Sequence, residues 1–300
     1  MLLKKLFLCF SLALVLSGCA SNSSLNLNTD KAPKKINQTI IEPSQDTSDK
    51  QPLDNPAKLP LKPVEVPNIL GLQTKKIGWS WKYLLKSNAD LLSKYQGYAF
   101  GDITSKEIYL TFDEGYENGF TASILDTLKA NNVQAAFFVT GPFVTGTFNG
   151  VNNIDLVKRM SSEGHLIANH SVHHKSMPSF IDENAFNAEL TGVQSAVDSI
   201  KGTKMSKFFR PPMGEFSELS LYYTQKLGYK SIFFSLAYND WDPKNQPDPL
   251  MAKQTLLKET KPGMICLLHA VSKTNALILD DLIKEWKLQG YKFKSLNELP

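Results

Sequence analysis

The sequence is most informative at Leu110-Thr111-Phe112-Asp113-Glu114-Gly115, where an apolar run ends in two adjacent carboxylates and a glycine. Parallel α/β folds carry their functional side chains at the carboxyl ends of strands, so this stretch predicts a strand that leads into a site. Polar motifs also follow later apolar runs, at His170-Ser171-Val172-His173-His174, Arg210-Pro211-Pro212-Met213-Gly214, Asp240-Trp241 and Leu267-Leu268-His269. We therefore expect the five motifs to meet at one edge of a sheet.

Around these motifs, β-branched and aromatic runs alternate with segments of helical spacing. The expected strands are 107–112, 135–140, 165–169, 207–210, 231–235, 264–269 and 291–295, and the expected helices are 124–130, 154–162, 183–201, 219–227, 250–259 and 275–288. Such alternation indicates an α/β fold of parallel βαβ units. The pattern fits a closed or partly open barrel, and it also fits an open doubly wound sheet.

Length and composition set the broad class. With 300 residues, of which 42% are hydrophobic, the chain can bury one large core, and we expect one catalytic domain with extensions. The formal net charge is only +4, without the basic stripe that nucleic-acid binding needs. We therefore expect no nucleic-acid partner.

The N-terminus is typical of an exported lipoprotein. Lys4 and Lys5 precede an apolar run at 6–16, which is too short to span a bilayer, and Leu16-Ser17-Gly18-Cys19 then resembles a bacterial lipoprotein cleavage box. The prediction is a signal peptide at 1–18 and lipid on Cys19. A short uncleaved anchor, or cleavage elsewhere, is the alternative.

Three segments are expected after the signal. Residues 19–67 are rich in Ser, Asn, Asp, Lys and Pro and lack apolar periodicity, which indicates a disordered tether. Residues 68–104 are predicted to form an N-terminal extension packed on the barrel, and 105–300 the catalytic domain. Cys266 lies in an apolar run, so we expect a buried core residue rather than a nucleophile.

Two of the histidines have the spacing of a metal site. His170 and His174 would share one face of a helical turn and could bind one ion through imidazole, whereas His173 would point elsewhere. A hydrolytic metal site also needs a carboxylate, for which Asp113 and Glu114 are the candidates. Arg210, held by the prolines that follow it, could pair with Asp113 and lower its pKa.

The five motifs in this order resemble the polysaccharide deacetylase family, the carbohydrate esterases with a NodB homology domain, over about residues 100–300. The resemblance implies a distorted (β/α)7 barrel and a hydrolase that uses one divalent metal ion, with zinc as the expected ion. It also implies roles for individual residues. Asp113 would be the general base that Arg210 holds, His269 the general acid that Asp240 orients, and Glu114, His170 and His174 the metal ligands.

Glu114 departs from the family pattern, because most members have Asp at this position. The extra methylene moves the carboxylate by more than an ångström, which is large against the tolerance of a metal site. Either the backbone compensates and Glu114 ligates directly, or Glu114 only supports the site and water completes the shell.

Other residues are expected to bind the substrate. The Met213 N–H, just after two prolines, is the candidate oxyanion donor. Trp241 and Leu267 are expected to form an apolar wall around the acetyl methyl. Trp79 and Trp81 precede the barrel and are expected to pack on it, although they could stack on sugar rings.

Two further stretches narrow the substrate by resemblance. Asp113-Glu114-Gly115-Tyr116-Glu117-Asn118-Gly119 and Leu268-His269-Ala270-Val271-Ser272-Lys273 look like the delta-lactam-biosynthetic branch, whose members deacetylate peptide-stripped N-acetylmuramic acid in the route to muramic δ-lactam of the spore cortex. The expectation is a monomer that acts on peptidoglycan strands, anchored by lipid to the outer face of the cytoplasmic membrane. The alternatives are a deacetylase of N-acetylglucosamine in peptidoglycan or chitooligosaccharides, and a catalytically silent wall-binding lipoprotein.

Overall fold

Strand β3 (Glu107–Glu114) is central to the fold and ends at the two adjacent carboxylates. All of its residues after Glu107 are buried, as expected for a strand covered on both faces. It pairs in parallel with β11 (Met264–His269) and with β4 (Ala136–Val139). This computed structural model describes residues 71–80, 82 and 86–300, so the predicted signal peptide, Cys19 and the tether lie outside the described residues.

The main sheet is parallel and curled. Its strand order is β11-β3-β4-β7-β8-β10-β2, and β12 also pairs with β3. The remaining strands of this sheet are β7 (Leu166–Asn169), β8 (Met205–Phe209), β10 (Lys230–Ile232), β2 (Gly97–Tyr98) and β12 (Lys292–Phe293). Phe100, just after β2, and Leu236, beyond β10, form bridges to Met264 and Cys266 of β11, so the two ends of the sheet meet. The distorted barrel is confirmed, and the open sheet is excluded.

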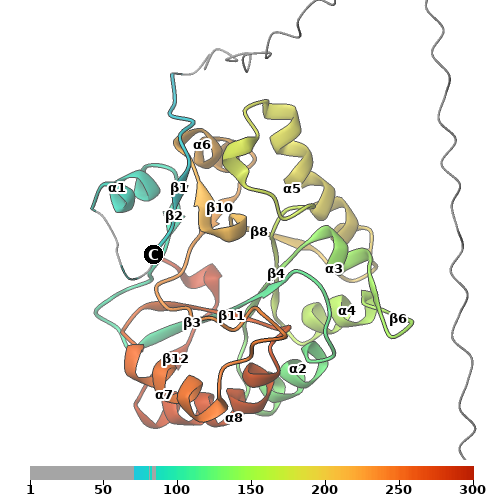
Figure 1. Cartoon of the computed structure of the whole chain (residues 1–300), viewed down its shortest axis with the longest axis vertical. Coiled ribbons are helices and arrows are strands. Elements are labelled where there is room, and N and C mark those ends of the chain that lie inside the picture. The colour runs from blue at the N-terminus through green and yellow to red at the C-terminus, as the bar shows by residue number, and fades with distance from the viewer. Residues whose placement is uncertain (1–70, 81, 83–85) are drawn as a thin grey trace, which may run out of the picture. The chain divides into compact units, whose positions relative to one another are not determined.

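Helices connect successive strands and pack around the outside of the sheet (Figure 1). All six predicted helices are present: α2 (Thr121–Ala130), α4 (Ile154–Ser162), α5 (Glu183–Asp198), α6 (Glu218–Lys226), α7 (Pro249–Glu259) and α8 (Lys273–Leu288). Helices α5, α7 and α8 begin at side-chain caps, where Asp182, Asp248 and Ser272 accept a hydrogen bond from a backbone N–H of the first turn. No helix in the described part of the chain is long and apolar enough to cross a membrane.

Short elements complete the described structure. They are α1 (Lys86–Lys94), α3 (Gly141–Thr145), the pair β1 (Ile77–Gly78) and β9 (Glu215–Phe216), the hairpin of β5 (Thr147–Phe148) and β6 (Val151–Asn152), and three 3-10 turns at Met177–Ser179, Pro212–Gly214 and Leu296–Glu298. None of these was predicted as a helix or strand. Strand β2 lies within the segment expected to be an extension, yet it hydrogen-bonds to β10 in the main sheet.

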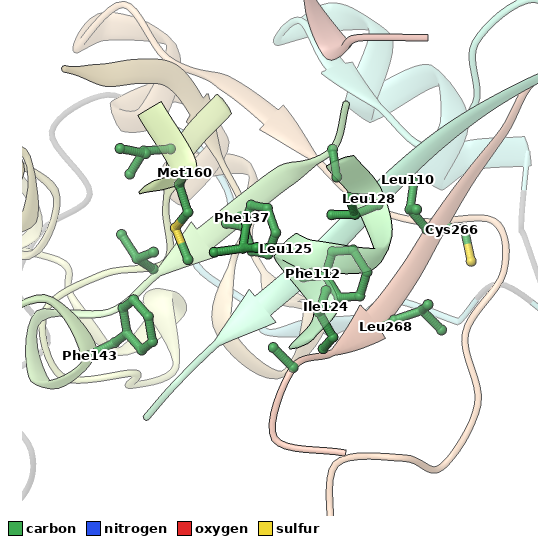
Figure 2. Close-up of a cluster of buried hydrophobic side chains, with 14 of the residues drawn as sticks. Leu110, Phe112, Ile124, Leu125, Leu128, Phe137, Phe143, Met160, Cys266 and Leu268 are labelled. Carbon is green, nitrogen blue, oxygen red and sulfur yellow. The ribbon is translucent and has the colours of Figure 1, made fainter. Parts of the chain in front are cut away.

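The main core lies between β3, its neighbours and the helices. Figure 2 shows Leu110 and Phe112 of β3 packed with Ile124, Leu125 and Leu128 of α2. Cys266 belongs to the same cluster and is fully buried, so the core prediction for it is confirmed. Tyr109, from the alternate positions of β3, belongs to a different cluster on the inner face of the sheet. The two faces of β3 therefore have different surroundings, which decides where its last two residues point.

Candidate active site

A cavity of about 820 Å³ lies at the carboxyl ends of the barrel strands. Eight of the predicted site residues line it: Asp113, His170, His174, Arg210, Met213, Trp241, Leu267 and His269. Parallel pairing accounts for part of this convergence, because His269 of β11 lies directly beside Asp113 of β3 in the sheet register. The expectation that the five motifs meet at one edge of the sheet is thus met.

Asp113 and Arg210 form a buried ion pair. Arg210 Nη1 donates to Asp113 Oδ1 at 2.6 Å, and Nη2 donates to Thr111 Oγ1 at 2.8 Å. Burial alone would raise the pKa of Asp113, but the positive charge of Arg210 outweighs it, with smaller help from His170 and His269, and the pKa falls below its usual value. Asp113 is therefore an ionised carboxylate at neutral pH, held in one orientation.

His170 presents one ring nitrogen to the cavity. Its Nδ1 lies 2.8 Å from the Arg210 carbonyl oxygen, so Nδ1 carries the proton and donates, and Nε2 keeps its lone pair. Nε2 lies 3.5 Å from Asp113 Oδ2. Burial lowers the pKa of His170 to about 4, so the ring is neutral, as a metal ligand must be. The His174 ring lies beside it, with 4.8 Å between ring centroids, and burial also lowers the His174 pKa.

The two histidines meet in a loop, and the expected helical turn is absent. Residues 170–174 have no helical assignment, and Ser171 and His174 adopt positive φ of 66° and 52°. Local side chains stabilise this loop in place of a helix: Asn169 Oδ1 accepts from Ser171 N, and Ser171 Oγ accepts from His174 N. The pairing of His170 with His174 was predicted, but the helical reason given for it was wrong.

His173 also faces the cavity edge, and a buried carboxylate holds it. Glu189 of α5 accepts from His173 Nδ1 at 2.7 Å and from His173 N at 2.9 Å, and Glu189 itself is only 5% exposed. Sequence reasoning missed Glu189, because an acidic residue in an amphipathic helix predicts only an exposed face.

Glu114 is not brought together with the histidines. It is fully buried, and both carboxylate oxygens lie near Thr121 Oγ1, at 3.3 and 3.4 Å, at the start of α2. Successive residues of a strand point to opposite faces, so Glu114 follows Leu110 and Phe112 toward the helices while Asp113 faces the cavity. Burial, and then the neighbouring carboxylate of Glu117, hold the pKa of Glu114 well above its usual value. Glu114 is therefore a protonated carboxyl group on the face of β3 that points away from the cavity. The expectation that it ligates the metal directly is corrected.

His269 and Asp240 form the second acid-base pair. Asp240 is fully buried and accepts from His269 Nδ1 at 2.7 Å and from His269 N at 2.8 Å. Burial alone would lower the pKa of His269, but the Asp240 charge and hydrogen bond outweigh this effect, and the pKa is raised. The imidazole can therefore carry a proton near neutral pH, with Nε2 left to face the cavity.

The expected substrate-binding residues occupy different depths. Leu267 is 5% exposed and forms part of the cavity wall, whereas Trp241 is 60% exposed and belongs to the mouth. Met213 also lines the cavity and has a left-handed backbone with φ of 58°, a strained conformation for a residue with a β-carbon. Trp79 packs against Phe233 and donates its Nε1–H to Phe234 O at 2.8 Å, which favours the packing role; Trp81 lies outside the described residues.

The donor set for a cation is incomplete in the described residues, where no group of three or more His, Cys, Asp and Glu side chains gathers into a metal site. The two neutral imidazoles nevertheless fit a divalent cation, because His170 donates its Nδ1–H to a carbonyl oxygen, as metal-bound histidines commonly do. Glu114 does not fit as the third ligand.

Comparisons with known proteins agree with this geometry. The family model described as polysaccharide deacetylase matches residues 101–232. The peptidoglycan-N-acetylmuramic acid deacetylase PdaA of Bacillus subtilis is 44% identical over 209 residues, which cover 70% of this chain and 77% of the relative. The solved structure of PdaA, a family 4 carbohydrate esterase, superposes with a TM-score of 0.71 at 41% identity, over 76% of this chain and 98% of that one. A family 4 carbohydrate esterase from Bacillus anthracis gives a TM-score of 0.65 at 39% identity, over 77% and 98%.

Proposed function

The chain belongs to the polysaccharide deacetylase family, and from this premise we propose that it hydrolyses the N-acetyl group of N-acetylmuramic acid in peptidoglycan. The observation that carries the proposal is the pairing, across one cavity, of an ionised carboxylate held by Arg210 with an imidazole held by Asp240. Amide hydrolysis needs such a base and such an acid, because the amine leaves only when it is protonated. The substrate is assigned from the 44% identity to PdaA and from the motifs around Tyr116 and Val271.

The proposed mechanism uses the two pairs in turn. Asp113 takes a proton from the attacking water, whose oxygen forms the new bond to the carbonyl carbon. The Met213 N–H donates to the carbonyl oxygen as negative charge builds on it. His269 then protonates the nitrogen as the C–N bond breaks, which gives acetate and a free amine. Leu267 packs beside the acetyl methyl, and Trp241 covers the sugar at the mouth.

One divalent cation, which we propose to be zinc held by His170 and His174, would lower the pKa of the attacking water and polarise the carbonyl group. The neutral state of both imidazoles supports this assignment. Glu114 is proposed to support the end of β3 from behind, with solvent completing the set of ligands.

We further propose that the protein is exported and anchored by lipid on Cys19 to the outer face of the cytoplasmic membrane, where it acts as a monomer on the wall or spore cortex. Cys19→Ala should give unprocessed precursor or unanchored protein in a membrane fractionation. Membrane retention of a fully processed Cys19→Ala protein would contradict the anchor.

The function is tested by acetate release from three substrates. The full chain with zinc should release more acetate from glycan whose muramic acid has lost its peptide than from peptidoglycan with intact stems or from chitin oligomers. The Asp113→Asn variant is the matched control for acetate from other sources. Equal release from chitin oligomers would favour an N-acetylglucosamine deacetylase, whereas zinc binding without any acetate would favour a silent wall-binding protein.

The product gives a second test in cells. A muramic acid whose nitrogen is free can close a lactam with its own lactyl carboxyl group. Muropeptides of a strain that lacks this protein should therefore contain no muramic δ-lactam when no paralogue substitutes. Normal lactam content in a strain without any paralogue would contradict the muramic acid assignment.

A further inference from the structure

Asn275, in the first turn of α8, lies directly behind the Asp240–His269 pair and is fully buried. Its Nδ2 donates to Asp240 Oδ2 at 2.5 Å and to the His269 carbonyl oxygen at 3.0 Å. Its Oδ1 accepts from the Tyr238 hydroxyl group. One amide thus contacts both members of the acid pair and a residue of the cavity wall.

These contacts fix the orientation of the amide. Both Nδ2 hydrogens have acceptors, and Oδ1 has a donor. A flipped amide would place Oδ1 against the Asp240 carboxylate and against a carbonyl oxygen, where it has no hydrogen to donate. The network therefore admits a single orientation, with the donor toward Asp240.

The Asn275 donor reaches the Asp240 carboxylate from α8, whereas the other two donors to this carboxylate belong to β11. Those two donors are the backbone N–H and the Nδ1–H of His269, so they tie the carboxylate only to β11. Asn275 ties the carboxylate to α8. The start of α8 is itself fixed, because Ser272 Oγ donates to Gln246 Oε1 at 2.6 Å and Gln246 Nε2 donates to the Asp240 carbonyl oxygen at 2.9 Å.

We propose that Asn275 is a positioning residue for the general acid, acting through Asp240 to hold the His269 imidazole in its productive orientation. This inference rests on the proposed deacetylase function. Asn275 is 0% exposed and does not line the cavity, so its effect should fall on kcat and leave KM and zinc affinity unchanged. Nothing in the spacing of the five motifs points to it.

The test is an isosteric substitution. Asn275→Asp keeps the shape of the side chain but replaces the Nδ2 donor by an oxygen, so it should lower kcat by about 10²-fold, the size of effect expected when a catalytic group is misplaced. Asn275→Ala, which removes the donor without adding a charge, should lower kcat by about tenfold or more. KM and zinc affinity should stay within about threefold for both variants, as for residues that do not contact substrate.

Thr274→Val is the matched control. Thr274 is the buried neighbour in the same turn, and its Oγ1 donates to the Pro247 carbonyl oxygen at 2.7 Å without contact to Asp240. Its loss should cost a similar hydrogen bond and leave kcat within about twofold. A folded Asn275→Asp or Asn275→Ala protein with the kcat of Thr274→Val would overturn the proposal.

A second readout needs no substrate. The Nδ1–H proton of His269, hydrogen-bonded to Asp240, should give a strongly deshielded NMR signal in the wild-type full chain and in Thr274→Val, and that signal should be lost or exchange faster in Asn275→Ala. Retention of the wild-type signal in Asn275→Ala would contradict the positioning role. If the signal responds as expected but the wild-type protein releases no acetate, the proposed function fails while the positioning role stands.

Discussion

The two faces of strand β3 give two neighbouring carboxylates opposite chemical states. Asp113 faces the cavity, where the buried Arg210 guanidinium lowers its pKa. Glu114 faces α2, where burial and Glu117 raise its pKa. Both side chains are almost completely buried, so burial alone does not distinguish them. The neighbouring charge does: the Arg210 cation outweighs burial and keeps Asp113 ionised, whereas burial, reinforced by Glu117, keeps Glu114 protonated.

The strand period explains why the chain separates the two groups. Side chains alternate between the faces of a strand, so adjacent carboxylates within β3 cannot both point into one cavity while the strand remains regular. Glu114 is the last residue of β3 and still pairs in register with Val139 of β4. Only one of the two acids is therefore available for chemistry.

The largest expected effect concerns the two histidines that are proposed to bind zinc in the cavity. His170→Ala and His174→Ala should each abolish both zinc binding and acetate release, because each removes one of two imidazole donors. His173→Ala should be mild, since its Nδ1 is bonded to Glu189 and its loss leaves both donors in place. Isothermal titration with zinc, together with acetate release, measures both effects. A His173→Ala protein as damaged as its neighbours would show that the donor set is wrong.

Loss of the base should come next in size. Asp113→Asn should lower kcat by about 10² to 10⁴-fold, the usual contribution of a general base, with zinc affinity largely kept. Steady-state kinetics and a zinc titration on the same preparation test this. If the folded Asp113→Asn variant loses its zinc, Asp113 is a metal ligand. A single carboxylate would then serve as both base and ligand.

The acid pair should set the alkaline limb of activity. The pKa of His269 is raised by Asp240, so its proton is present below that pKa and is lost as pH rises through it. In Asp240→Asn the charge is gone while the burial remains, so the limb should move to lower pH and kcat should fall about 10- to 100-fold near pH 8. The pH profile of kcat measures this shift. If the alkaline limb does not move, His269 is not the group that donates the proton.

The sequence predicted the features of the site that follow from motifs at strand ends, and it did not predict short strands or the depth of a side chain in the cavity. The barrel strands and the strand-end positions of Asp113, Arg210 and His269 followed from apolar runs that end in polar motifs. Strand β2 was not predicted, because Gly97–Tyr98 is too short to show the alternation of buried and exposed side chains that identifies a strand. Trp241, expected in the acetyl wall, lies at the mouth, since a motif places a residue after a strand without fixing its depth.

Contacts between distant elements could not be predicted. Asn275 in a first helical turn has the sequence signature of an ordinary helix start, and only the packing of α8 behind Asp240 reveals its amide contacts. For Glu114 the sequence left direct ligation and a supporting role open. The family motif suggested a ligand, but the alternation of side chains along a strand places Glu114 on the other face, which favours the supporting role.

The smallest expected effect concerns Glu114, on the face of β3 that packs against α2. Glu114→Gln should change kcat/KM by less than about threefold, because an isosteric neutral side chain keeps the packing. Its effect on stability has a defined sign. The folded chain keeps Glu114 protonated where the unfolded chain ionises, so the stability it contributes is complete below the usual glutamate pKa and declines as pH rises.

Glutamine has no such ionisation. The Tm of Glu114→Gln relative to wild type should therefore increase between about pH 5 and about pH 8. Thermal unfolding at the two pH values measures the difference. A constant difference in Tm would mean that Glu114 is already ionised in the folded chain, and the contrast between the two faces would be lost.

The structure of the zinc-loaded full chain tests the separation of the two faces most directly. We predict that the ion binds His170 and His174, with Asp113 still paired to Arg210 and the Glu114 carboxyl group still beside Thr121. A Glu114 oxygen within about 2.2 Å of the ion, the distance of a direct zinc–carboxylate bond, would contradict the account.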